Sequence, residues 1–478
     1  MENLKIKKMY LAGEWVQRDK YIEVYNPQDN SFITRVSAAN EKDVLHAIEE
    51  AKEGAKIAAN MSVHERIKIL NSAANWIKNN QEKYATTIAL EGSKTIKEAR
   101  KEVSRCIETL LISSEEARRI NGETISFDQM PGSENRIGYY YRFPIGIIAA
   151  ITPFNDPLNL VAHKIGPAIA SGNAIIVKPA SITPLSALLL AEAFEKAGLP
   201  PKVLSVITGN IRDMGDNLII HPAIRMISFT GGLATGESIM KKAGLKKVGM
   251  ELGANSPVIV LEDANIDEAV KSIVSGAFWA AGQNCLSVQR IYIQEEVYQE
   301  FLIKFTNLAK QYRVGDKLSE ETDMGPMISE KEAQRVESWV NEAVEKGARL
   351  LCGGVRKGAF YYPTVLDNVP LECKIINEEV FGPVVTLKSV SSLDLAIKKS
   401  NDVNYGLQAG IFTNNIEKAL KAVKKLNVGG VMINDSSDYR IDAMPFGGIK
   451  GSGIGREGIK FAIQEMTESK VVCFKVSN

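Results

Sequence analysis

Two side chains that could carry out chemistry lie in one stretch of the sequence, from Gly249 to Gln289. Cys285 follows a run of small residues, Ala-Ala-Gly at 280–282, which leaves room beside its sulfur for a substrate carbonyl. Glu251 could act as a base for this thiol. A lone cysteine is more often a small buried hydrophobic residue, and a lone glutamate is more often a surface charge. The pair therefore indicates catalysis only if further motifs support it.

Four motifs supply that support, and they occur in a fixed order: Phe229-Thr230-Gly231-Gly232, Glu251-Leu252-Gly253, Gly282-Gln283-Asn284-Cys285 and Glu379-Val380-Phe381-Gly382-Pro383. Together they resemble the aldehyde dehydrogenase superfamily, from about residue 8 to the C-terminus. The resemblance implies an α/β fold with a Rossmann-type cofactor domain, a second α/β catalytic domain and a small oligomerisation hairpin. It also implies NAD(P)-dependent oxidation of an aldehyde to its carboxylate.

Length and composition set the class of the protein. A chain of 478 residues exceeds the size of a single core, so we expect two or more domains. Hydrophobic residues at 45% and charged residues at 24% argue against extensive disorder. A net charge of +1 provides no overall field for binding nucleic acid or an anionic membrane. We therefore expect neither nucleic acid nor a membrane as a partner.

Targeting and metal signals are also missing from the sequence. No apolar run reaches the roughly 18 residues of a membrane span, and Met1 to Lys5 has no apolar signal core. The five cysteines are irregularly spaced and form no C-x-x-C pair. We expect a cytoplasmic protein without a disulfide framework and without a metal site.

The order of apolar patterns predicts the organisation of the chain. Residues 8–36 alternate as a small antiparallel entry, residues 40–119 are helical, and residues 122–141 alternate as a protruding hairpin. A later set of strands between 287 and 431 predicts a second α/β domain. Five short apolar runs separated by helix-like segments predict a parallel sheet with crossover helices: 145–151, 173–177, 203–207, 226–229 and 258–261.

The resemblance divides the chain more finely. It assigns residues 1–122 and 145–252 to the cofactor-binding domain and residues 253–446 to the catalytic domain. Residues 123–144 and 465–478 become oligomerisation elements of a homodimer or homotetramer, and residues 447–464 return towards the cofactor domain.

Thr152, Pro153, Phe154 and Asn155 follow the run 145–151, at the sheet edge where open α/β folds bind ligands. The Asn155 amide, with the backbone N–H of Cys285, could hold the oxyanion that forms when a thiolate adds to an aldehyde. An ordinary turn asparagine is the alternative, and the resemblance favours the oxyanion role.

Cofactor contacts follow from the resemblance. It gives Lys178 a ribose or phosphate contact, where the alternative is a surface lysine. Gly231 and Gly232 open a helix whose free amides can meet a pyrophosphate, although relatives more often have serine at position 232. It also places Glu379 on the nicotinamide ribose and Phe381 beside the ring.

Position 181 bears on the choice between NAD and NADP. Family members that favour NAD tend to carry glutamate here, because its carboxylate binds the adenosine ribose and repels a 2′-phosphate. Ser181 does neither. We therefore expect NAD or NADP as cofactor, with NADP tolerated.

The implied mechanism has two stages. The Cys285 thiolate adds to the aldehyde, hydride leaves for the nicotinamide, and Glu251 then activates water to hydrolyse the thioester. Relatives that transfer the acyl group to coenzyme A generally lack this glutamate. A cysteine hydrolase is disfavoured because the four histidines (46, 64, 163 and 221) lie in none of the cysteine motifs. Retention of the catalytic set also disfavours a non-catalytic structural relative.

Substrate class is indicated by two arginines and one aspartate. Arg105 and Arg440 occupy positions that border the substrate tunnel in relatives acting on short anionic aldehydes, although both could be solvated surface charges. Asp156 stands where many members have an aromatic residue, which resembles lactaldehyde, phosphonoacetaldehyde and sulfolactaldehyde dehydrogenases. We expect a short aldehyde bearing a hydroxyl, carboxylate, phosphonate or sulfonate. The alternative is a broad-specificity aldehyde or succinate-semialdehyde dehydrogenase.

Overall fold

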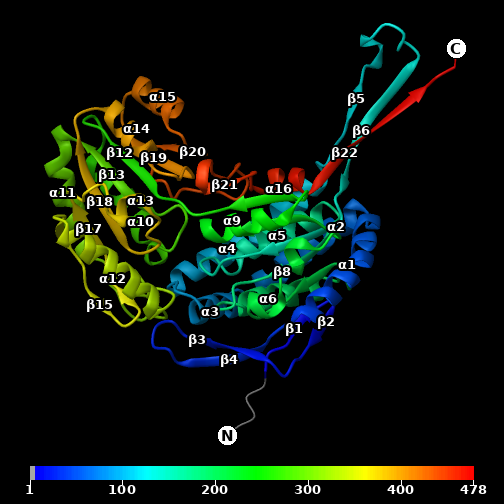
Figure 1. Cartoon of the computed structure of the whole chain (residues 1–478), viewed down its shortest axis with the longest axis horizontal. Helices are drawn as coiled ribbons and strands as arrows, with labels where there is room; N and C mark the ends of the chain where they lie inside the picture. Colours follow the sequence, from blue (N-terminus) through cyan, green and yellow to red (C-terminus); the bar gives the residue numbers. More distant parts are fainter. Residues whose placement is uncertain (1–5, 478) are drawn as a thin grey trace.

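A computed structural model describes residues 6–477. The expectation about a signal core at Met1 to Lys5 lies outside the described residues, as does Asn478 at the end of the second oligomerisation element. Two large sheets dominate the molecule, and Figure 1 shows them side by side with a small three-stranded sheet projecting as an arm.

The eight-stranded sheet has the order β2-β1-β9-β8-β7-β10-β11-β21. Its central strands are parallel, while β1 and β21 pair antiparallel with their inner neighbours. The strands are β1 (Met9–Leu11), β2 (Glu14–Val16), β7 (Ile147–Ile151), β8 (Ala174–Lys178), β9 (Leu204–Val206), β10 (Ile224–Thr230), β11 (Lys247–Glu251) and β21 (Gly453–Ile454).

The seven-stranded sheet has the order β14-β17-β18-β13-β12-β19-β20, and only its edge strand β14 is antiparallel within the described chain. Its strands are β12 (Ser256–Val260), β13 (Val288–Gln294), β14 (Arg349–Cys352), β17 (Thr364–Asp367), β18 (Val384–Val390), β19 (Gln408–Phe412) and β20 (Gly430–Ile433). The apolar run at 258–261 was grouped with the first sheet, and that grouping is wrong, because β12 pairs with β13 and β19. A fully apolar run shows that a strand is buried on both faces but not which sheet it joins.

Helices cover both faces of the two sheets. Those on the side of the eight-stranded sheet, several of which pack on other helices, are α1 (Glu41–Asn60), α2 (Val63–Asn79), α3 (Gln81–Glu91), α4 (Ile96–Ala117), α5 (Asn159–Ala170), α6 (Leu185–Lys196), α7 (Ile211–Met214), α8 (Asn217–Ile220), α9 (Leu233–Ala243) and α16 (Ile459–Glu465). The others are α10 (Ile266–Phe278), α11 (Glu295–Lys310), α12 (Glu330–Glu345), α13 (Lys374–Asn377), α14 (Leu393–Asn401) and α15 (Ile416–Lys425), with 3-10 turns η1 (Phe127–Gln129), η2 (Trp279–Gly282) and η3 (Lys450–Ser452).

Smaller strand pairs complete the fold: β3 (Tyr21–Tyr25) with β4 (Phe32–Ser37), and β15 (Arg356–Lys357) with β16 (Phe360–Tyr361). The hairpin predicted at 122–141 is present as β5 (Glu123–Ile125) and β6 (Arg136–Pro144), and β22 (Thr467–Lys475) pairs along all of β6. These three strands form the projecting arm in Figure 1.

Helix α4 starts at a capping box. The Thr95 side chain accepts from the N–H of Glu98, while the Glu98 carboxylate accepts from the N–H of Thr95 at 2.8 Å. Two of the amides at the start of the helix are thereby satisfied. One face of α4 is apolar and packs into the core through Val103, Cys106 and Leu110. The helix therefore has a fixed start and a fixed rotation.

Candidate active site

A cavity of about 500 Å³ lies beside Cys285, bordered by α4, the loop after β7, the turn η2 and the segment 435–440. Asn155 lines it together with Cys285, and so do Arg105 and Arg440. The structure thus brings the predicted nucleophile, the predicted oxyanion donor and the two predicted substrate arginines into one cavity.

The turn that carries Cys285 has an unusual backbone. Ala280, Ala281 and Gly282 all have positive φ, at 49°, 55° and 69°. This conformation costs a residue with a Cβ about 1–2 kcal/mol, so the turn must be held by its surroundings. At Gly282 a Cβ would lie 2.1 Å from the carbonyl oxygen of Gly382, so only glycine fits. The small-residue run in the sequence therefore marks a strained turn as well as open space.

Burial raises the pKa of the Cys285 thiol to about 12, and the carboxylates of Glu379 and Glu251 add to this effect. The guanidinium of Arg440 acts in the opposite direction. The sulfur lies 3.7 Å from the side-chain oxygen of Asn284. The thiol is protonated in this arrangement, so formation of a thiolate needs a base or a change in the surroundings on binding.

Glu251 is the last residue of β11 and is 4% exposed. Its Oε2 atom finds no hydrogen-bond partner within residues 6–477. The side chain lines a separate small cavity with His163, Arg456 and Glu457, and it is absent from the linings of the two cavities that contain Cys285. Burial raises its pKa well above the ordinary value, and Glu457 raises it further. Glu251 is therefore near Cys285 electrostatically but does not face the substrate cavity.

A second cavity, of about 450 Å³, meets the first at Cys285 and Asn155. Its lining holds most of the residues predicted for the cofactor: Thr152, Pro153, Phe154, Gly231, Gly232, Glu379 and Phe381.

The polar groups of this second cavity suit an anionic ligand. The buried hydroxyls of Thr152 and Thr230 have no hydrogen-bond partner in the described part of the chain. Helix α9 starts at Gly232 without a side-chain cap, and a Cβ at Gly232 would meet open space. Its first amides and the positive end of the helix dipole thus face the cavity.

Glu379 and Phe381 form the opposite wall. The Glu379 carboxylate accepts from the N–H of Ala254 at 2.9 Å, and burial raises its pKa to about 7. The rings of Phe381 and Phe154 meet edge to face, with centroids 5.8 Å apart.

Lys178 and Ser181 lie outside this cavity. Lys178 is 7% exposed, and its Nζ donates to the Ser181 hydroxyl at 3.0 Å, which donates to the carbonyl of Gly209 at 2.7 Å. Burial lowers the pKa of Lys178 to about 8. Ser181 lines a wide neighbouring cavity that reaches the β3–β4 hairpin.

The two arginines differ in what already binds them. Arg105 Nη2 donates to Asp442 at 2.8 Å, and Nη1 lies 3.7 Å from Asp156. The Arg440 side chain is 7% exposed and stacks on Phe446 at 3.6 Å. Within the described residues its Nε and Nη2 make no hydrogen bond, and the carboxylate of Glu457 is 3.6 Å away. Arg440 therefore lines the cavity with two N–H groups that make no hydrogen bond, one of which is ion-paired with Glu457.

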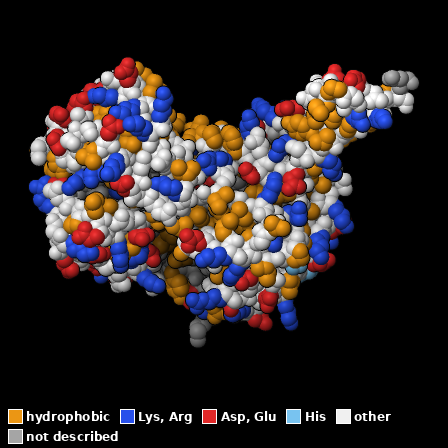
Figure 2. Space-filling model, turned by 45° about the horizontal axis from the view of Figure 1, so that its top comes forward, with side chains coloured by type: hydrophobic (Ala, Val, Ile, Leu, Met, Phe, Trp, Pro, Cys, Tyr) orange, Lys and Arg blue, Asp and Glu red, His pale blue; other side chains and the backbone are white. Residues whose placement is uncertain are grey.

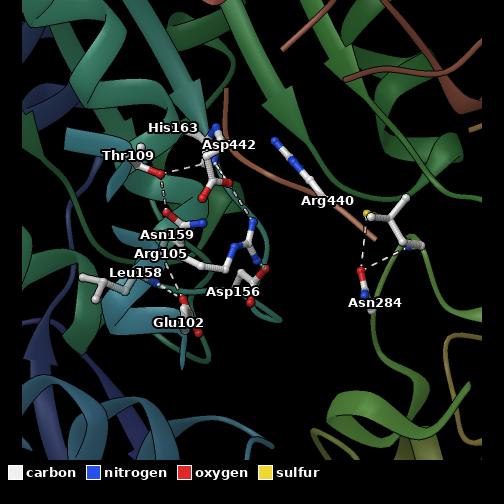
Figure 3. A network of polar contacts seen from close by, with 12 residues as sticks. Glu102, Arg105, Thr109, Asp156, Leu158, Asn159, His163, Asn284, Arg440 and Asp442 are labelled. Carbon is white, nitrogen blue, oxygen red and sulfur yellow. Dashed lines mark hydrogen bonds and ion pairs between the residues drawn. The ribbon is translucent and has the colours of Figure 1, made fainter. Parts of the chain in front are cut away.

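Figure 3 shows the polar network that includes Arg105. Asp442 accepts from Arg105, and its Oδ1 lies 2.8 Å from His163 Nε2. In the same view Arg440 has no dashed line to the other residues drawn. The network fixes the segment around Asp442 and leaves Arg440, two residues earlier, beside the cavity.

Sequence reasoning missed several charged residues that line the cavity: Lys94, Lys101, Glu102, Asp435 and Asp438. A signal for some of them was present. The pattern Thr95-x-x-Glu98 is a capping box, which sets the start of α4 and hence the face that carries Glu98 and Glu102. Asp435 and Asp438 lie in an irregular segment, for which no periodicity predicts a direction.

The described residues contain no group of three or more His, Cys, Asp or Glu side chains placed to hold a metal ion. No helix between residues 6 and 477 is long and apolar enough to cross a membrane.

Comparisons with known proteins agree on one family. The sequence model described as the aldehyde dehydrogenase family matches residues 15–472. The chain is 50% identical to aspartate-semialdehyde dehydrogenase 1 of Pseudomonas canavaninivorans, over 96% of this chain and 97% of that protein. It is 46% identical to 3-sulfolactaldehyde dehydrogenase of Priestia aryabhattai, with 97% of each covered. Among solved structures, glyceraldehyde-3-phosphate dehydrogenase of Methanocaldococcus jannaschii complexed with NADP is 40% identical, with a TM-score of 0.92 over 96% of this chain and 100% of that chain.

Proposed function

Because the chain belongs to the aldehyde dehydrogenase family, we propose that it oxidises a short anionic aldehyde to the carboxylate with NAD or NADP. One observation supports this proposal above the others. Cys285, Asn155 and two N–H groups of Arg440 that make no hydrogen bond share a single cavity that meets a second, cofactor-sized cavity.

The first chemical step belongs to Cys285. The Glu251 carboxylate, as the base for the Cys285 thiol, takes the thiol proton and passes it to water, and the sulfur forms a bond to the aldehyde carbon while the carbonyl electrons move to oxygen. The resulting oxyanion is held by the Asn155 amide and the Cys285 backbone N–H, a contribution of about 3–4 kcal/mol in comparable sites. A nicotinamide dinucleotide in the second cavity would supply the acceptor for the hydride that leaves the substrate carbon as the oxyanion re-forms the carbonyl. A thioester on Cys285 is left.

Glu251 acts in the second step. Its carboxylate takes a proton from water, the water oxygen attacks the thioester carbon, and the Cys285 sulfur leaves. Its raised pKa suits a base, since burial makes the carboxylate a stronger proton acceptor. Because Glu251 lines the small cavity with Glu457, its side chain must rotate towards Cys285 for this step.

The cofactor proposal rests on the second cavity. The uncapped start of α9 would meet the pyrophosphate, and the unpartnered hydroxyls of Thr152 and Thr230 offer further hydrogen bonds. Glu379 and Phe381 would border the nicotinamide end, next to Cys285. Ser181 carries no charge, and the ammonium of Lys178 lies beside it, so a 2′-phosphate meets no repulsion there. Both NAD and NADP should therefore be accepted. Residues 6–122 and 145–252 would form the cofactor half.

The substrate proposal rests on Arg440. A buried guanidinium with two N–H groups that make no hydrogen bond can bind a carboxylate, sulfonate or phosphonate once it turns from Glu457, 3.6 Å away. The relatives named above act on aldehydes that carry a carboxylate, a sulfonate or a phosphate. Arg105 is a weaker candidate, because its guanidinium already binds Asp442 through Nη2.

We assign the β5–β6–β22 arm to subunit contact in a homodimer or homotetramer. Its exposed side chains include Ile137, Tyr141, Phe143, Val471 and Phe474. Figure 2 shows hydrophobic side chains gathered along the arm. A projecting apolar sheet of this kind is typical of an assembly interface. Light scattering of the full chain and of a Val471→Lys, Phe474→Lys variant tests this, and a monomeric full chain would refute it.

One experiment tests the function directly. Purified protein is given NAD or NADP and, separately, succinate semialdehyde, aspartate semialdehyde, sulfolactaldehyde, phosphonoacetaldehyde, lactaldehyde and hexanal, and reduced cofactor is measured. We expect the highest kcat/KM with an anionic aldehyde. Hexanal as the best substrate would refute the substrate class, and no reduction with any aldehyde would refute the oxidoreductase function.

A further inference from the structure

We propose that Glu98 and Glu102 of α4 are positioning residues that together set the spacing between Cys285 and Asn155. This inference rests on the proposed roles of the latter two residues. The two glutamates are one helical turn apart, on one face of α4. One holds the turn before the nucleophile, and the other holds the loop after the oxyanion donor.

Glu98 holds the nucleophile turn. Its Oε1 accepts from the backbone N–H of Ala280 at 2.8 Å, and the residue is 3% exposed. Ala280 is the first of the residues with positive φ that lead to Cys285. The turn is also held by the loop before α12, because the side chain of Gln283 donates to the Ala280 carbonyl and accepts from the N–H of Ile328. Glu98 supplies the hydrogen bond that comes from α4, and Lys101 of the same helix lies over the Trp279 ring at 4.6 Å.

Glu102 holds the loop that carries Asn155. Its Oε1 accepts from the N–H groups of Leu158 and Asn159, at 2.8 and 3.0 Å. These are amides at the start of α5, which has no side-chain cap of its own. The second oxygen of Glu102 accepts from Lys94 at 2.7 Å, and Lys94 also pairs with Asp156, the neighbour of Asn155. The part of the loop that follows Asn155 is thus held at residues 156, 158 and 159.

The two contacts act through one rigid element. A separation of four residues corresponds to about 6 Å along a helix axis, and α4 cannot slide because its start is capped and its apolar face is packed. Buried carboxylates with several N–H partners do not leave those partners readily. The distance between the Cys285 turn and the Asn155 loop is therefore determined by helix geometry, although the two segments belong to different sheets.

Because Glu98 holds the turn that carries Cys285, its removal should lower the rate of the reaction. Displacement of a reacting group by about 1 Å can lower a rate by about 100-fold. Glu98→Ala releases the Ala280 amide, so we expect kcat to fall about 10- to 100-fold, with the KM for NADP changed less than about threefold.

Thr95→Ala is the matched control, because it weakens the same capping box and leaves the bond from Ala280 to Glu98 in place. It should lower the melting temperature by a similar amount and keep kcat within about threefold. If Glu98→Ala does not fold, Glu98→Gln takes its place. Its single amide oxygen cannot serve both Ala280 and Thr95, so an intermediate loss is expected. Glu102→Gln, which keeps one oxygen for the α5 amides and loses the ion pair with Lys94, should also lower kcat.

A double-mutant cycle separates alignment from general damage. If Glu98 acts by keeping Cys285 in line with the Asn155 amide, then Glu98→Ala should cost less than about threefold in an Asn155→Ala background. Alkylation of Cys285 by iodoacetamide, which does not need the oxyanion donor, should stay within about threefold of wild type. An undiminished loss in the Asn155→Ala background, or an equal loss in Thr95→Ala, would overturn the inference. Full turnover by Asn155→Ala itself would instead overturn the proposed function.

Discussion

Replacement of Arg440 should change which aldehydes are oxidised more than how fast oxidation occurs. The Arg440 side chain is 7% exposed, its Nε and Nη2 make no hydrogen bond among the described residues, and Nη2 pairs with the Glu457 carboxylate at 3.6 Å. A hydrogen bond to a charged group contributes about 1.5–3 kcal/mol, so two such bonds to a substrate anion amount to at least about 3 kcal/mol. At about 1.4 kcal/mol per factor of ten, this corresponds to about 150-fold in kcat/KM.

The quantity to measure is a ratio. Arg440 also lowers the pKa of the Cys285 thiol and of Glu251, so Arg440→Ala will slow every aldehyde to some extent. The ratio of kcat/KM for an anionic aldehyde to that for a neutral aldehyde of equal length removes this shared effect. We expect the ratio to fall about 100-fold or more in Arg440→Ala. In Arg440→Lys, which keeps the charge and loses the planar fork, it should fall about tenfold.

Arg105→Gln serves as the control, because the Arg105 fork is already bound to Asp442. It should change kcat/KM for both aldehydes by a similar factor and leave the ratio within about threefold. The reasoning fails if the ratio in Arg440→Ala stays within twofold of wild type, or if Arg105→Gln lowers it as much as Arg440→Ala does.

Three further predictions concern the proposed chemistry. Cys285→Ala should abolish turnover, while alanine at each of the other four cysteines should retain it; activity in Cys285→Ala would exclude the thioester route. Glu251→Gln should give a single burst of reduced cofactor followed by little turnover, and in the wild type hydrolysis should rise with pH, because burial raises the pKa of Glu251 and only its ionised form accepts a proton. A variant that turns over without a burst, with an unchanged pH profile, would reject that base. Ser181→Glu should shift the ratio of kcat/KM for NAD and NADP towards NAD by about 10- to 100-fold, since a hydrogen-bonded carboxylate contributes about 1.5–3 kcal/mol and repels a 2′-phosphate. Ser181→Gln is the uncharged control. An unchanged ratio in Ser181→Glu would show that position 181 does not sense the phosphate.

Much of the fold was predictable because its signals are local. The apolar runs at 145–151, 173–177, 203–207 and 226–229 became adjacent strands of one parallel sheet, as their composition and spacing indicate. The run at 258–261 was placed in the wrong sheet, because burial on both faces leaves the same pattern in either sheet. The pairing of β22 with β6 joins segments more than 300 residues apart, and no local pattern specifies such a partner.

The candidate site was predictable where a motif carries the residue. Cys285, Asn155, Arg105 and Arg440 were named from the sequence, and the structure places all four on one cavity. The small cavity that Glu251 lines could not be foreseen, because its other lining residues, including His163, Arg456 and Glu457, come from distant parts of the chain. The same holds for Arg105, since its partner Asp442 is brought to it only by tertiary folding. Residue types and motifs indicate chemistry, while side-chain directions depend on long-range packing.

The two sheets differ in how much of the chain must exist before each can close. Every strand of the seven-stranded sheet comes from the continuous segment between Ser256 and Ile433. The eight-stranded sheet, in contrast, pairs β11 with β21 (Gly453–Ile454), which follows every strand of the other sheet in the sequence. During synthesis the seven-stranded sheet can therefore form first. The edge of β11 that pairs with β21 stays unpaired while roughly 200 further residues are synthesised. That unpaired edge belongs to the strand that ends at Glu251, so the segment that bears the proposed base is open to pairing with other strands during synthesis.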